Sequence, residues 1–129
     1  MAEIERDGWD VVMDRILNEA LDGPEYLYIS FDIDVLDPAY TPGTGTPVAA
    51  GLTPREVFPL LRTLCSENSL VGFDLVELNP LLDPGYTTVM NSGYIVQECM
   101  TGIAMRKAGI VERGYLSPLT TEDNEPDPE

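Results

Sequence analysis

Histidine is absent from this sequence of 129 residues. Without it, the chain alone cannot build a Ser-His-Asp or Cys-His catalytic arrangement, or a metal site with imidazole ligands. There are only two cysteines, Cys65 and Cys99, and each is isolated in a segment predicted to be helical. That placement argues against a disulfide framework or a cysteine-based zinc site, and it favours two buried, reduced thiols in a cytoplasmic protein.

Basic residues are scarce: 7 Lys and Arg stand against 23 Asp and Glu, for a formal net charge of -16 at pH 7. Such a surface repels nucleic acid and anionic membranes, so we expect neither as a partner. It favours cationic small molecules or reflects a salty environment. No apolar run approaches the roughly 20 residues that span a bilayer. No signal peptide is predicted either, and the expected location is the cytoplasm.

The length suits one domain with a modest core. Residues 1–112 are expected to form that domain. Residues 113–129 are acidic and contain several prolines. This composition predicts a disordered tail, because it offers little apolar surface to bury.

Apolar spacing and turn residues predict the order helix, strand, helix, strand, helix. The second helix has a clear start, since Thr53 and Glu56 can form a capping box around Pro54. Pro59 lies inside that helix and is expected to kink it. The predicted elements are a helix at 9–21, a strand at 26–31, a helix from residue 53, a strand at 70–78 and a helix at about 88–108.

This order predicts an α/β fold containing a right-handed βαβ unit with parallel strands. Both strands are mostly apolar, so we expect them to be buried on both faces. Two parallel strands need neighbours at their edges and helices on both faces. The sequence therefore predicts that the rest of a sheet is missing or is supplied by a partner.

Two acidic residues, Asp32 and Asp34, follow the first predicted strand. Strand alternation would point both side chains the same way, at the strand end where ligand sites of α/β sheets gather. Two carboxylates this close repel each other unless a cation lies between them, and Mn²⁺ or Mg²⁺ would suit. A bare Asp-x-Asp pair, however, more commonly caps turns at a strand end, and that alternative stays open.

The wider segment closely resembles a known family. It reads SFDIDVLDP at residues 30–38, then AYT, then PGTGTP at 42–47. Further matches are GLTPRE at 51–56 and FDLVELNP at 73–80. Together they resemble the third signature of the ureohydrolases, the family of arginase, agmatinase, guanidinobutyrase and formimidoylglutamase. The resemblance covers nearly the whole chain up to about residue 112.

That resemblance implies a fold and a chemistry. The fold would be the parallel βαβ portion of a three-layer α/β/α arginase-like fold, from the C-terminal part of a ureohydrolase domain. Asp32 and Asp34 would be ligands of a binuclear Mn²⁺ centre, whose bridging hydroxide attacks a guanidinium carbon to give urea and an amine. Glu77 would hold the guanidinium group. On its own, Glu77 would be interpreted as a solvated or structural carboxylate, and we interpret Asp37 and Asp74 as structural.

The chain departs from the family pattern in three ways. The family's histidine ligand and its Asp-Ala-His-x-Asp segment are absent. Ala50 stands where many relatives have a second glycine, and Pro59 is unusual in the following helix. The sequence of residues 37–47 resembles those of agmatinases and guanidino-acid hydrolases more than those of arginases. The expected substrate is therefore a small guanidino compound, agmatine or a guanidino acid.

Three interpretations follow from these observations. The first is a fragment or truncated gene product of a manganese amidinohydrolase, inactive alone, for which a homo-oligomer is expected. The second is a non-catalytic subunit that associates with a full-length ureohydrolase. The third is a stand-alone βαβ module that binds a divalent metal.

Overall fold

The computed structural model describes residues 2–23 and 25–110. The predicted order of helices and strands is confirmed, and three short helices were not predicted. The proposed tail at 113–129 lies outside the described residues. The elements are α1 (Ala2–Asp7), α2 (Trp9–Leu21), β1 (Leu27–Asp32), the 3-10 helix η1 (Ile33–Val35), α3 (Pro54–Glu67), β2 (Leu70–Val76), the 3-10 helix η2 (Pro80–Leu82) and α4 (Thr87–Lys107).

Helix α3 begins as its sequence predicts. The backbone N–H and the hydroxyl of Thr53 both donate to the Glu56 carboxylate, at 2.7 and 2.8 Å, and Pro54 occupies the first helical position. Because the first N–H groups of a helix have no intrahelical acceptor, this capping box stabilises the start. The helix continues past Pro59 to Glu67.

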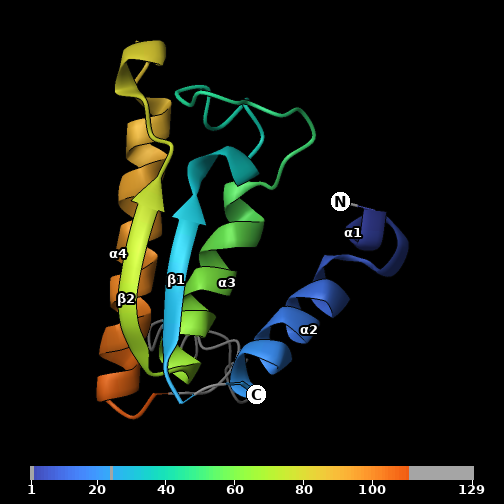
Figure 1. The fold of residues 1–129 in the computed structure, drawn as a ribbon, viewed down its shortest axis with the longest axis vertical. Helices are drawn as coiled ribbons and strands as arrows, with labels where there is room; N and C mark the ends of the chain where they lie inside the picture. Colours follow the sequence, from blue (N-terminus) through green and yellow to red (C-terminus); the bar gives the residue numbers. More distant parts are fainter. Residues whose placement is uncertain (1, 24, 111–129) are drawn as a thin grey trace, which may run out of the picture.

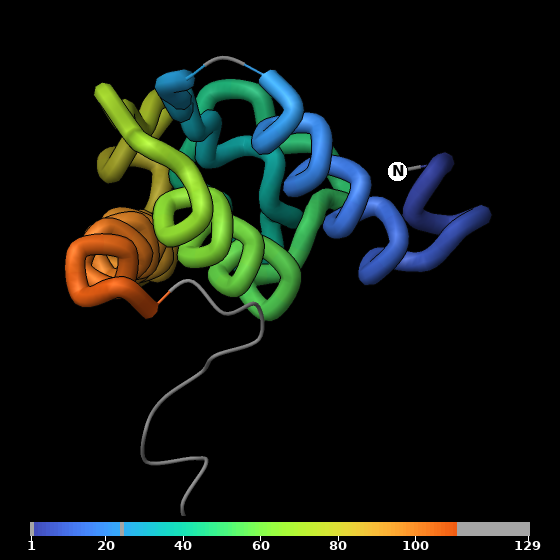
Figure 2. Tube along the Cα trace, turned by 90° about the horizontal axis from the view of Figure 1, so that it is seen from below, coloured from blue at the N-terminus to red at the C-terminus, as the bar shows by residue number. Residues whose placement is uncertain are grey.

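Strands β1 and β2 lie side by side and parallel, joined by α3, which confirms the α/β class. Their register pairs Ser30 with Asp74 and Asp32 with Val76. Helices α3 and α4 both lie on one side of the two strands (Figures 1 and 2). Burial on both strand faces was therefore wrong for the described residues: no described helix covers the other face, and Tyr28 on that face is 57% exposed.

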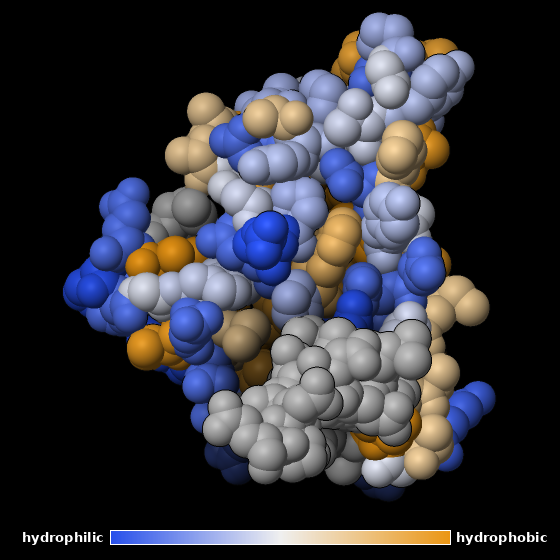
Figure 3. Space-filling view, turned by 180° about the vertical axis from the view of Figure 1, so that it is seen from behind, coloured by the Kyte–Doolittle hydropathy of each residue, from blue (hydrophilic) through white to orange (hydrophobic). Residues whose placement is uncertain are grey.

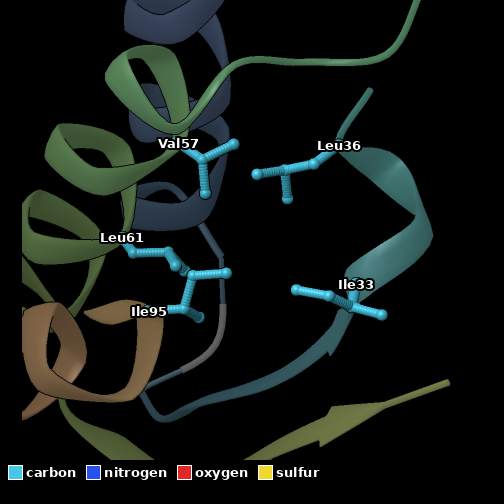
Figure 4. Close-up of a cluster of buried hydrophobic side chains, with 5 residues drawn as sticks. All are labelled: Ile33, Leu36, Val57, Leu61 and Ile95. Atoms are coloured by element: carbon cyan, nitrogen blue, oxygen red, sulfur yellow. The ribbon is translucent and has the colours of Figure 1, made fainter. Parts of the chain in front are cut away.

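The core lies between the covered sheet face and the two helices. Ile33 and Leu36, just beyond β1, point toward Val57 and Leu61 of α3 and Ile95 of α4 (Figure 4). All five side chains are buried. Burying a side chain of this size stabilises a fold by roughly 1.5–3 kcal/mol. The core thus fixes the segment immediately after β1, where the predicted site lies.

The outer side of the molecule, viewed from behind in Figure 3, shows mainly hydrophilic residues with apolar residues in small separate groups. That is the expected outer surface of amphipathic helices whose apolar stripe faces a core. None of the helices in the described ranges is long and apolar enough to cross a membrane.

Both cysteines are buried, as predicted. Their isolation in the sequence does not carry over to the fold. Helices α3 and α4 pack together, and the Sγ atoms of Cys65 and Cys99 lie 2.7 Å apart. Sequence spacing alone could not reveal this contact, because it depends on how the two helices cross.

Candidate metal and substrate site

The predicted site residues gather at the carboxyl ends of the two strands. Asp32 is the last residue of β1, and Glu77 follows the last residue of β2. Asp32 is paired with Val76, so Glu77 lies one residue beyond the partner of Asp32. The loop after η1 and the start of α4 lie at this same end (Figure 1). Ligand sites in parallel α/β sheets form at such ends.

Asp32 ends β1 and caps the turn that follows. Its Oδ1 atom accepts a hydrogen bond of 3.1 Å from the backbone N–H of Asp34. Turn capping, the alternative left open above, is therefore part of what Asp32 does. The strand-alternation argument for Asp34 needs correction, because Asp34 lies in η1 and not on the strand. The hydrogen bond from the Asp34 N–H to Asp32, rather than the alternation of side chains along a strand, brings the two residues together.

Asp34 is held by the loop at 42–47. The Thr46 hydroxyl donates to Asp34 Oδ2 at 2.6 Å. Within the described ranges, no hydrogen bond reaches Asp32 Oδ2 or Asp34 Oδ1. Each carboxylate is thus oriented through one oxygen and keeps the other available to a ligand.

Glu77 has an unusual backbone. Its φ is 63°, in the left-handed region that non-glycine residues seldom adopt and that costs of order 1–3 kcal/mol. The residues after it hold this conformation: Leu78 bridges Thr44, and the N–H of Asn79 donates to the Gly43 carbonyl at 2.8 Å. The Glu77 side chain is exposed and accepts no hydrogen bond from the described residues.

The same loop also approaches Glu77. A Cβ atom placed on Gly45 would lie 3.8 Å from Glu77 Oε2. The loop therefore touches Asp34 through Thr46 and passes Glu77 at Gly45. The sequence singled out this loop only as a segment that matches the family, and it gave neither residue a contact. The run of Gly and Thr was the signal, and only the fold shows which members matter.

The loop is anchored to the start of α4. The Gly43 N–H donates to Thr88 Oγ1 at 2.7 Å, and the Thr88 N–H donates to Asp83 Oδ2 at 2.6 Å. A Cβ atom on Gly43 would lie only 2.8 Å from Asp83 Cβ. Asp83 is buried, and its hydrogen bonds, that from the Thr88 N–H first, lower its pKa.

Asp37 is occupied by structural contacts. It accepts backbone N–H bonds from Ala39 and Ala50, both at 2.8 Å, and backbone hydrogen bonds, that of Ala39 first, lower its pKa. Ala50 itself has a φ of 63°. The departure from glycine noted above is therefore accommodated at a cost of about 1–2 kcal/mol.

Asp74 lies within β2, on the uncovered sheet face. Its Oδ2 accepts a bond of 2.5 Å from the Tyr28 hydroxyl, and hydrogen bonds from Tyr28 and then Ser30 lower its pKa. Its Oδ1 is buried without a partner among the described residues. These contacts agree with a structural role.

The donor set fits part of a metal site. Carboxylate oxygens are ligands that Mn²⁺ accepts readily. Asp32 and Asp34 each offer one such oxygen. Across residues 2–23 and 25–110, however, no three His, Cys, Asp or Glu side chains are grouped so that they could hold a metal ion. The pair can contribute to a coordination shell but cannot complete it.

Comparisons with known proteins agree on the family. The model of the Arginase family matches residues 1–102. The mitochondrial agmatinase of Gallus gallus is 44% identical over 89 residues, which are 69% of this chain and 25% of that protein. The crystal structure of a hypothetical agmatinase from Burkholderia thailandensis superposes with a TM-score of 0.72 and 36% identity, over 84% of this chain and 33% of that one.

A third comparison points the same way. The proclavaminate amidino hydrolase of Streptomyces clavuligerus has a TM-score of 0.72 and 39% identity, over 81% of this chain and 35% of that chain. The fold is thus arginase-like. The chain spans about a quarter of the length of the curated relatives that it matches. With signature segments, fold and family model in agreement, this chain belongs to the arginase family, the ureohydrolases.

Proposed function

We propose that this chain forms part of the active site of a binuclear manganese amidinohydrolase. The reaction would hydrolyse a guanidino compound, agmatine or a guanidino acid, to urea and an amine. One observation carries the proposal: Asp32, Asp34 and Glu77 lie at the same end of the parallel strands, with one loop contacting Asp34 and passing Glu77. The two proposed metal ligands and the Glu77 carboxylate, which would bind the substrate, would then face the same space.

Asp32 and Asp34 would be manganese ligands. Their support is the pair of carboxylate oxygens that no described donor occupies, while the other two oxygens are fixed by the Asp34 N–H and the Thr46 hydroxyl. Ligands oriented in this way bind a metal with less loss of side-chain freedom. When bound, the metal pair would supply an activated water as nucleophile.

Glu77 would bind the substrate. A carboxylate and a planar guanidinium form two parallel charge-assisted hydrogen bonds, and the Glu77 carboxylate is exposed and accepts no hydrogen bond within the described chain. Glu77 lies just beyond the end of β2, in a left-handed backbone conformation. The net charge of -16 also favours the approach of a cationic substrate.

The relatives' names narrow the substrate class. They include agmatinases and the human mitochondrial guanidino acid hydrolase, which is 43% identical over 81 residues. We propose agmatine or a guanidino acid on this basis. The cytoplasmic location stays a prediction, and the relatives include proteins named as mitochondrial.

The remaining metal ligands would come from polypeptide outside these 129 residues. The sequence has no histidine, and the described residues group no third carboxylate or thiol with the aspartate pair. We therefore propose that the 129-residue polypeptide alone is inactive. The uncovered sheet face also favours a second candidate, a non-catalytic subunit that docks on a full-length ureohydrolase.

A chimera tests the proposal. Residues 2–110 would replace the matching segment of the Gallus gallus agmatinase, and urea release from agmatine and from a guanidino acid would be measured with manganese present. We expect urea release, and we expect Asp34→Asn to abolish it. Glu19→Gln, at an exposed position of α2, is the control and should leave the rate unchanged. A folded chimera that binds manganese yet releases no urea from either substrate would contradict the proposal.

A further inference from the structure

Cys65 of α3 and Cys99 of α4 face each other in the interior. Their residues are 0% and 3% exposed. Neither belongs to the candidate site, which lies at the carboxyl ends of the strands. Their positions follow from the packing of α3 on α4, where the two helices approach closely.

Two contacts fix that approach on either side of the cysteines. Gly102 lies three residues after Cys99, and a Cβ atom there would be 2.3 Å from the Arg62 carbonyl oxygen and 2.7 Å from Cys65 Cβ. Only glycine permits such a distance. Beside Cys99, Glu98 accepts two hydrogen bonds from the Arg62 guanidinium, at 2.5 and 2.8 Å.

The close approach of the two helices therefore keeps the two cysteines facing each other. Their separation of 2.7 Å is shorter than the roughly 3.5–4.0 Å at which nonbonded carbon atoms rest, although sulfur is larger than carbon. Two thiols can relieve this crowding by rotating apart, or by forming a bond. From the burial, the helix approach and the facing thiols, we propose that Cys65 and Cys99 form a reversible disulfide that links α3 to α4.

The reaction needs an oxidant, and a low-molecular-weight disulfide of the glutathione type would serve. One cysteine thiolate attacks this disulfide, expels one small thiolate and forms a mixed disulfide. The second cysteine thiolate then attacks the protein sulfur of that mixed disulfide and expels the other small thiolate. The protein loses two electrons and two protons, and the small disulfide becomes two thiols.

Cys65 lies beside a surface hollow, although the residue itself is 0% exposed. A surface hollow near the ends of α3 and α4 is lined by Cys65, Ser69, Leu70, Ile103, Arg106 and Lys107, among others. The two basic side chains favour an anionic small disulfide. Burial raises the pKa of the Cys65 thiol, and Cys99 raises it further. Exchange is therefore slow at neutral pH, because the thiolate is the reacting form.

The test measures how strongly the fold favours the bond. The 129-residue chain would be equilibrated with mixtures of reduced and oxidised glutathione, quenched with acid and mapped by peptide mass, in native buffer and in concentrated guanidinium chloride. We expect the effective concentration of one thiol at the other to be at least about 100-fold higher in native buffer. A native value within about tenfold of the denatured value would overturn the proposal.

A pair of glycine variants keeps the test independent of general instability. Gly102→Val pushes α4 away from α3 and should lower the native effective concentration at least about tenfold. Gly93→Ala lies in the same helix, with no atom within 4 Å of its new Cβ. It should leave the native effective concentration unchanged. Cys99→Ser should yield only the mixed disulfide at Cys65. An equal effective concentration in Gly102→Val and the parent chain would refute the proposed geometry.

Discussion

The Thr46 hydroxyl donates a hydrogen bond of 2.6 Å to Asp34 Oδ2, and so joins the loop at 42–47 to a carboxylate at the end of β1. The two residues are twelve positions apart. The contact leaves Asp34 Oδ1 for a ligand and limits how far the side chain can rotate. Thr46 would thus act as a positioning residue for a proposed metal ligand.

Thr46→Val should weaken manganese binding in the agmatinase chimera. Removing a hydrogen bond that orients a metal ligand typically costs 10- to 100-fold in metal affinity or activity, and we expect a loss of about that size. Thr101→Val removes a hydroxyl that bonds the Gln97 carbonyl on α4, far from the site, and serves as the control. Manganese titration would measure the manganese affinity of both variants. Equal affinity in the Thr46 variant and the parent would show that the contact does not position Asp34.

Two glycines of α4 should respond oppositely to the same substitution. Gly102→Ala places a Cβ atom 2.3 Å from the Arg62 carbonyl oxygen, so we expect a loss of about 1–3 kcal/mol in the free energy of unfolding. Gly93→Ala meets nothing within 4 Å and should gain up to about 1 kcal/mol, because alanine favours a helix. Denaturant unfolding of the chimera would compare the free energies of unfolding of the two variants. Similar effects at both positions would contradict the close helix packing.

Acid should destabilise the protein partly through Asp83. Its folded-state pKa lies below the unfolded value of about 3.9, because the backbone N–H of Thr88 and other groups bond the charged form. Stability from this group is therefore fully present above the unfolded pKa and is lost as pH falls through the lower folded pKa. We expect Asp83→Asn to be less stable near neutral pH and to lose less stability on acidification.

The measurement is the denaturant midpoint of the chimera as a function of pH, with Glu19→Gln as the control for a lost surface charge. Parallel pH curves for Asp83→Asn and the parent would rule out this role for Asp83.

The order of elements and the place of the acidic residues could be predicted because both depend on local sequence. Helical spacing from Trp9 to Leu21 and the capping residues around Pro54 act within a few residues. Asp32 was placed at the end of the first strand for the same reason. The second strand was predicted to run to residue 78, but it ends at Val76, so Glu77 lies just beyond it. The family resemblance then supplied roles that spacing alone could not assign.

What could not be predicted depends on contacts between distant segments. The Asp32 cap turns the chain into η1, so the strand alternation that was expected to align Asp34 with Asp32 does not apply. The approach of Thr46 to Asp34, and that of Cys65 to Cys99, arise only when loops and helices pack. Burial of the strands on both faces was wrong because, among the described residues, helices cover only one face.

The uncovered sheet should make the 129-residue chain self-associate. In the described structure β1 and β2 pair only with each other, so both have an edge open to strand addition. Val71 of β2 is 64% exposed, and Val71→Lys should reduce association by placing a charge on an edge strand. Val48 is 65% exposed in the loop, and Val48→Lys is the matched control. Sedimentation would measure how much of each chain is monomeric and how much is associated. A parent chain that stays monomeric would contradict the expectation.

The most direct measurement compares Asp34→Ala with Glu77→Ala in the chimera, by manganese content and urea release. A lost metal ligand should abolish activity and lower the manganese content. A lost guanidinium partner should leave the manganese content nearly intact and weaken substrate binding by about 10- to 100-fold, since a hydrogen bond to a charged group contributes about 1.5–3 kcal/mol. Equal manganese loss in both variants, or none in Asp34→Ala, would contradict the proposed roles.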